Sequence, residues 1–150
     1  MNSLLMSINT DNMDANEFMI GNWIEFFEDG LLCRIIGIDK HGFRVYIPKT
    51  KEETCIEYDK FYPIPLTEEI LDKIGFGVFF DTCPLELNPK HGRYLGRFEI
   101  FRRFENGNII FMYPDVLGKY RDVLYVHQLQ NLYYYFCGKD LKVELNTDNI

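Results

Sequence analysis

Short runs rich in Ile, Val and Phe, separated by glycine-containing turns, constrain the N-terminal part of this chain most strongly. The runs lie near residues 22–27, 31–38, 43–47 and 54–58, and the sequences "EDG" and "KHG" separate the first three. Runs of this length and composition are typical of β-strands, and glycine supplies the positive φ that tight turns need. Because strands at hairpin spacing pair antiparallel, we expect residues 17–62 to form a small, barrel-like (SH3-like) antiparallel sheet.

The following stretch, "FYPIPLTEEILDKIGF" at 61–76, has a different pattern. Pro63 and Pro65 disfavour a central strand, because proline lacks the N–H that a sheet ladder needs. Thr67 is a good N-cap, and the two glutamates after it lie where the helix dipole favours negative charge. Gly75 is placed to end the helix in the left-handed conformation. The stretch therefore predicts a helix of about two turns that packs against a sheet.

A β-hairpin is predicted by the Asn-Gly dipeptide at 106–107, which lies between two strand-like runs in "RFEIFRRFENGNIIFMYP". Asn-Gly is the strongest short-range signal for a two-residue hairpin turn. Such a turn places Arg102 opposite Phe111. Before the hairpin, we expect a strand at 77–80 and then an irregular, proline-containing loop that reaches Tyr94.

The densest stretch of the chain, "YVHQLQNLYYYFCG" at 125–138, predicts a helix over 126–137 that ends at Gly138. A turn of 100° per residue places one set of side chains on an apolar, buried face: Leu129, Leu132, Tyr133 and Phe136. It places a second set on an exposed, polar face: His127, Gln130, Asn131 and Tyr134. After Gly138, the run "LKVEL" at 141–145 is expected to form a final strand.

These segments together predict an α+β fold without repeats. We expect residues 1–16 to form a flexible tail and residues 17–150 to form a single compact domain. Within that domain, 17–62 is the barrel-like sheet and 63–150 the part made of helix, hairpin, helix and final strand.

Composition limits the class of protein. Of the chain's 150 residues, 47% are apolar, which is enough for a core, and the net charge is −7, which should repel phosphate backbones. No apolar run approaches the roughly 20 residues that a membrane span requires. The start of the chain lacks a basic signal-peptide region, and none of the four cysteines forms a CxxC pair. We therefore expect a cytoplasmic protein with reduced thiols and no membrane association.

No catalytic or metal-binding constellation is recognisable. The sequence contains no nucleophile elbow, no phosphate-binding loop and no dinucleotide fingerprint. Its three histidines have no second ligand-type residue at the helical spacing of zinc sites. We therefore expect a protein that is not an enzyme, with no catalytic residue, no metal and no cofactor.

One segment raises the alternative of nucleic-acid binding. Residues 93–113 carry four arginines against two glutamates, which gives 4 − 2 = +2 in a chain of net charge −7. Arg97, Arg102 and Arg103, interleaved with phenylalanines, would be the nucleic-acid contacts. The other interpretation is that these arginines pair with the chain's own acidic groups and cover the sheet's aromatic rings.

Three motifs together resemble a family of uncharacterised small proteins encoded by gut Bacteroidetes and by their phages or mobile elements. They are "IGNWI" (20–24), "PIPLTEEILDKIGF" (63–76) and "YVHQLQNLYYYFCGKDL" (125–141). The chain departs from the family pattern at Met19, where the family has arginine, and at Ile70, where it has tryptophan. The resemblance implies a phage or mobile-element origin and a shared architecture, and it implies no reaction.

The polar residues that match the family's third motif are His127, Gln128, Gln130 and Asn131. One interpretation is that His127 and Gln128 satisfy free backbone groups at the helix start. The other is that the polar face binds a protein partner through His127, Gln130, Asn131 and Tyr134. The function hypothesis from sequence is a non-catalytic protein-interaction module of phage or mobile-element type.

Overall fold

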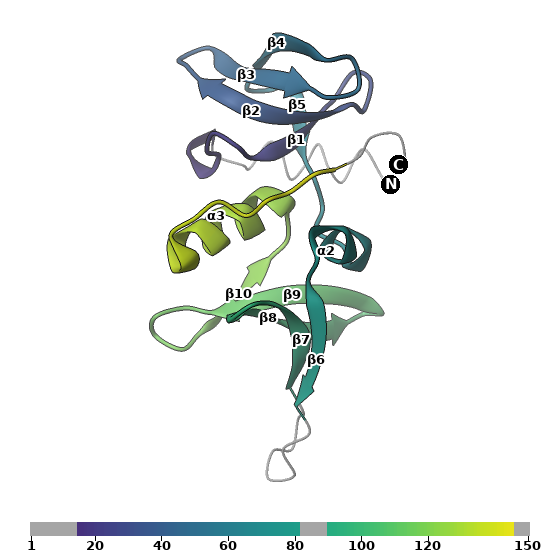
Figure 1. Ribbon diagram of the computed structural model, residues 1–150, viewed down its shortest axis with the longest axis vertical. Helices are drawn as coiled ribbons and strands as arrows, with labels where there is room; N and C mark the ends of the chain where they lie inside the picture. The colour runs from purple at the N-terminus through teal and green to yellow at the C-terminus, as the bar shows by residue number, and fades with distance from the viewer. Residues whose placement is uncertain (1–14, 82–89, 146–150) are drawn as a thin grey trace. The chain divides into compact units, whose positions relative to one another are not determined.

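The computed structural model describes residues 15–81 and 90–145, and in these ranges the chain forms an α+β fold with two five-stranded antiparallel sheets and two α-helices (Figure 1). The predicted fold class is therefore confirmed. The described residues divide into two compact units. The first contains the chain up to Pro65, then 125–131 and Leu145, and the second contains 66–124 and 132–144.

The two units differ in detail from the predicted parts 17–62 and 63–150, because residues 125–131 join the first unit. The expected flexible tail, 1–16, lies outside the described residues except for Ala15 and Asn16. These two residues begin a short 3-10 helix, η1 (Ala15–Glu17).

The first sheet is a curled half-barrel with the strand order β4-β3-β2-β1-β5. Its members are β1 (Trp23–Phe26), β2 (Leu32–Ile38), β3 (Gly42–Ile47), β4 (Glu52–Glu57) and β5 (Phe61–Pro63). The first four are the predicted strands. The fifth is an edge strand, where the missing N–H of Pro63 costs no ladder bond.

The core of the first unit is aromatic and aliphatic. The rings of Phe18, Phe43 and Phe61 lie 5.0 to 5.6 Å apart between centroids. Ile24 and Ile35, on adjacent strands, are fully buried beside them. Phe18 belongs to the segment that leads into β1, so this segment is part of the core.

The second sheet has the order β10-β9-β8-β7-β6. Its strands are β6 (Gly77–Asp81), β7 (Lys90–Leu95), β8 (Phe98–Glu105), β9 (Asn108–Pro114) and β10 (Tyr120–Val123). The predicted hairpin turn is confirmed, with φ of 52° at Asn106 and 80° at Gly107. Arg102 pairs with Phe111, as expected.

Helix α2 (Glu68–Ile74) lies on one face of this sheet (Figure 1). Thr67 is its N-cap, and the Thr67 side chain accepts a hydrogen bond from the backbone N–H of Ile70. Gly75 ends the helix with a φ of 101°. Both capping predictions are confirmed.

The loop predicted between residue 81 and Tyr94 is wrong where it overlaps β7, which runs from residue 90 to 95. Residues 82–89 of that loop lie outside the described part of the chain. Gly92, within the predicted loop, lies inside β7 at a position where a side chain would not fit. A Cβ at this position would lie 2.0 Å from the carbonyl oxygen of Ile100 on β8.

Helix α3 (Val126–Cys137) has the predicted bounds. Gly138 follows it with a φ of 70°, and the Gly138 N–H donates to the carbonyl of Tyr134 over 2.9 Å. The final strand predicted at 141–145 is wrong, because this segment does not form a strand. Its alternating apolar residues are nevertheless buried.

No helix in the described ranges is both long enough and apolar enough to cross a membrane.

Candidate functional site

The first half of α3 places its polar side chains against the chain itself. His127 is fully buried, so the expectation that it lies on an exposed face is wrong. Its imidazole stacks on Phe18 with centroids 3.9 Å apart, and it lies parallel to the Tyr125 ring at 5.8 Å. Neither ring nitrogen has a hydrogen-bond partner among the described residues, and the Glu17 carboxylate lies 3.6 Å from Nε2. Burial lowers the pKa of His127 to about 3, so the ring is neutral at neutral pH.

Gln130 and Asn131 hold the segment that enters β1. Gln130 is also buried. It accepts a hydrogen bond from the Trp23 N–H over 3.0 Å and donates one to the carbonyl of Gly21 over 2.9 Å. Asn131 donates to the carbonyl of Glu17 over 2.7 Å, while its own oxygen accepts from the Asn22 side chain over 2.9 Å. Both side chains therefore act as intramolecular clamps on this segment.

Gln128 caps the start of the helix. Its side-chain oxygen accepts a hydrogen bond from the Tyr125 backbone N–H over 3.2 Å, which is the return half of a capping box. The capping interpretation is thus confirmed for Gln128 and wrong for His127. Of the four residues expected on the polar face, Tyr134 is the one that is exposed, with 46% of its surface accessible.

The arginines of the hairpin have carboxylate partners. Arg102 lies 2.8 Å from Glu68 and also donates to the His91 ring over 3.2 Å. Arg103 lies 2.6 Å from Asp122 and 2.9 Å from Glu105. For Arg102 and Arg103 the structure therefore shows the other interpretation, in which the arginines pair with the chain's own acids; among the described residues, Arg97 does not pair in this way.

Arg93 is the most buried of the arginines, with 2% exposure. It pairs with Glu68 and Asp72 of α2, and it donates to the backbone carbonyls of Phe76 and Gly77 over 2.8 and 3.2 Å. This network ties α2 to the second sheet. It was missed in the sequence because the partners are 16 to 25 residues away along the chain.

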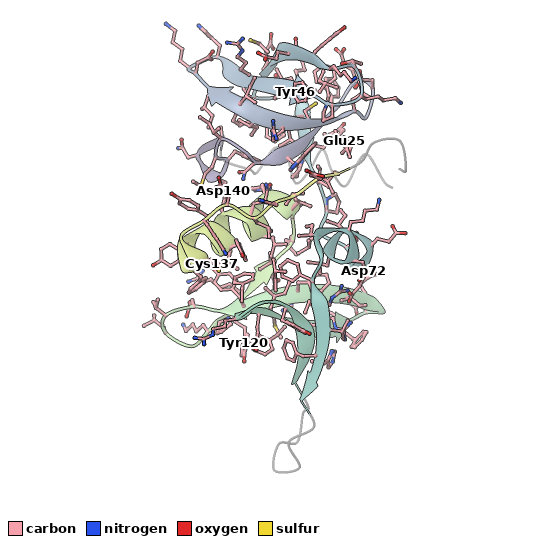
Figure 2. All side chains as sticks on the ribbon, in the orientation of Figure 1. Glu25, Tyr46, Asp72, Tyr120, Cys137 and Asp140 are labelled. Atoms are coloured by element: carbon pink, nitrogen blue, oxygen red, sulfur yellow. The ribbon has the colours of Figure 1, made fainter. Side chains whose placement is uncertain are left out.

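A groove of about 690 Å³ lies in the second unit, where β8 and β9 separate. The two strands pair from Glu105 opposite Asn108 to Phe101 opposite Met112, and β9 pairs beyond that point with β10 alone. The C-terminal half of α3 forms the third wall of this groove. Figure 2 labels Cys137 at this end of the helix.

The walls of the groove are mainly aromatic. Phe98 and Tyr133 are both buried at 7% exposure, and their rings lie 5.2 Å apart. Phe136 is 53% exposed and contacts the rings of Phe98 and Tyr113, each at 6.4 Å. The prediction that Phe136 lies in the core is therefore wrong. It forms part of an open wall.

Three charged residues also line the groove: Arg97, Glu99 and Lys139. Arg97 lies in the two-residue turn between β7 and β8, which Gly96 enters with a φ of 60°. Within the described ranges, neither Arg97 nor Lys139 has an ion-pair partner. The sequence singled out Arg97 for its charge, and the structure places it beside aromatic side chains instead of along a basic stripe.

A comparison of this chain with known protein families finds no match, and comparisons with curated proteins and with solved structures find none either. The candidate site therefore depends on geometry alone.

The thiols of Cys33, Cys55 and Cys137 are free, and Cys83 lies outside the described residues.

Proposed function

We propose that this chain is a non-catalytic protein-interaction module, of phage or mobile-element type, that binds an extended segment of a protein partner in the groove between β8, β9 and α3. The observation that carries the proposal is the aromatic lining of that groove. Phe98 and Tyr133 form a buried floor, and Phe136 forms an open wall.

Exposed aromatic rings beside a concave surface are typical of binding sites, because their burial contributes much of the energy of protein association. Tyr134, Tyr135 and Phe136 follow one another at the end of α3 with exposures of 46%, 74% and 53%. The groove volume, about 690 Å³, lies within the range of about 300–1,000 Å³ that is usual for ligand pockets.

The separation of β8 from β9 favours an extended occupant. Strand edges bind extended segments through backbone hydrogen bonds, while neighbouring pockets accept alternate side chains. Phe98 and Glu99 of β8 lie beyond the last pair of β8 with β9, which is Phe101 opposite Met112, and all three β8 residues line the groove.

The charge pattern supports a protein partner over a nucleic acid. Binding to a phosphate backbone requires several cations free to neutralise it. Arg102 and Arg103 are held by carboxylates, and the chain carries a net charge of −7. We therefore do not retain the arginine hairpin as a binding surface.

The test is a selection of random peptides on the immobilised protein. The proposal predicts that selection yields a shared motif containing a large apolar side chain. The variant Phe136→Ser should lose the selected peptides. The variant Phe104→Ser is the matched control, because Phe104 is 66% exposed and lies outside the groove lining. Equal binding by both variants, or failure to select any motif, would refute the proposal.

A further inference from the structure

We infer that the segment bound in the groove is acidic, with a carboxylate next to its apolar anchor that pairs with Arg97 and Lys139. This inference rests on the proposed function and specifies the partner's chemistry.

Arg97 is distinguished from every other arginine that the structure describes. Those at 44, 93, 102, 103 and 121 each pair with a carboxylate, and Arg34 lies over the ring of Tyr46 at 5.9 Å. In an acidic chain, a surface arginine readily finds a carboxylate. Arg97 has neither a carboxylate nor a ring partner in the described ranges, and it lines the groove.

Lys139 adds a second unpaired cation from a different element. It follows Gly138 at the end of α3 and lines the same groove as Arg97. Counting Glu99 as well, the groove carries 2 − 1 = +1 within a chain of net charge −7. A carboxylate of the partner would therefore find a locally favourable potential here, although the protein as a whole repels anions.

The aromatic floor fixes which part of the partner is charged. Phe98 and Tyr133 are buried and offer an apolar surface, so the side chain above them must itself be apolar. Arg97 and Lys139 are exposed, so their partner group remains near water. The expected motif is thus a large apolar residue flanked by Asp or Glu.

The experiment measures the affinity of a selected, fluorescently labelled peptide for the whole chain at low and at high salt. Arg97→Glu and Lys139→Glu should each weaken binding roughly tenfold at low salt, and the loss should shrink at high salt. Lys142→Glu is the matched control, because Lys142 is exposed and lies outside the groove lining, and it should change affinity less than about twofold. Replacing the peptide's acidic residues by their amides should reproduce the loss.

Three outcomes would overturn the inference. Selected peptides without acidic residues, whose binding is unchanged in Arg97→Glu and Lys139→Glu, would refute the charge complementarity and leave the proposed function standing. Failure to select any peptide would refute both. Self-association that is detected by sedimentation and abolished by Phe136→Ser would show that a second copy of the chain occupies the groove, and this would also refute both.

Discussion

The imidazole of His127 stacks on the ring of Phe18, with centroids 3.9 Å apart and an angle of 23° between the planes. This contact joins the first turn of α3 to the core of the first sheet. Since His127 is fully buried and lacks a hydrogen-bond partner among the described residues, it serves here as a neutral aromatic ring.

The stability of the chain should therefore fall in mild acid. Burial lowers the pKa of His127 to about 3 in the folded protein, while the unfolded chain has the ordinary value near 6.5. His127 therefore binds a proton less readily in the folded protein than in the unfolded chain. The contribution of neutral His127 to stability is fully present above pH 6.5 and is lost progressively as the pH falls toward 3. By pH 5 the loss from this group should be about 2 kcal/mol. Urea unfolding at pH 7 and pH 5 measures it.

The variant His127→Phe keeps an aromatic ring and removes the titrating group. It should lose about 2 kcal/mol less than the parent protein between pH 7 and pH 5. The variant His41→Gln, at an exposed turn, should behave as the parent does. The same pH dependence in His127→Phe and the parent would contradict the prediction.

Gln130 should matter more for stability than Asn131. Gln130→Ala leaves the Trp23 N–H and the Gly21 carbonyl without their partner, and an unsatisfied buried group costs about 1–3 kcal/mol. We expect a loss of at least about 2 kcal/mol in the free energy of unfolding. Asn131→Ala should cost about 1 kcal/mol, since Asn131 is half-buried and water replaces part of its bonding. Thermal or urea unfolding compares the two, and an equal loss would be inconsistent with this assignment.

Arg93→Ala should destabilise the second unit strongly. It removes a buried cation from Glu68 and Asp72 and leaves two backbone carbonyls unpaired, for which we expect a loss of about 3 kcal/mol. Arg103→Ala is the matched control, because it also removes a paired arginine but at an exposed site, and its effect should be much smaller. If both variants have similar unfolding midpoints, the Arg93 network is not structural.

Stability and binding should separate within the groove. Phe98→Ala should cost about 3–5 kcal/mol of unfolding free energy, because it removes a buried ring from the floor. Phe136→Ser should cost less than about 1 kcal/mol, because Phe136 is largely exposed. Calorimetry of both variants tests this. A large loss for Phe136→Ser would show that its ring is needed for folding, and loss of binding in that variant would then carry no information on the groove.

Local chemistry made much of the fold predictable from sequence. Asn106 and Gly107 adopt the two positive φ values of their turn, and Thr67 and Gly75 cap α2 as expected. The bounds of α3 follow from periodicity and from Gly138. In each case the signal lies within a few residues of the structure that it specifies.

The burial of α3 was not predictable in this way. Periodicity assigns one face of a helix to the core and the other to solvent, but in α3 the first turn is buried on the His127 side and later turns on the Tyr133 side. The amide side chains of Asn22, Gln130 and Asn131, in the first and third of the quoted motifs, were the available signal. These side chains form hydrogen bonds to one another or to backbone groups in or near the other motif. Their partners lie 107 to 114 residues away in the sequence, so no local pattern reveals them.

The groove escaped prediction for a related reason. It depends on where β8 and β9 separate and on which side chains of α3 reach that point. Arg97 could be singled out for its charge, but its neighbour in the groove, Lys139, lies 42 residues further along and carried no local signal.

The most direct test of the central claim is an amide NMR titration of the chain with a selected peptide. Our account predicts chemical-shift changes concentrated at 95–101, Tyr113 and 133–139, and their loss in Phe136→Ser. Shift changes concentrated at 17–23 and 127–131, with the groove residues unaffected, would contradict it.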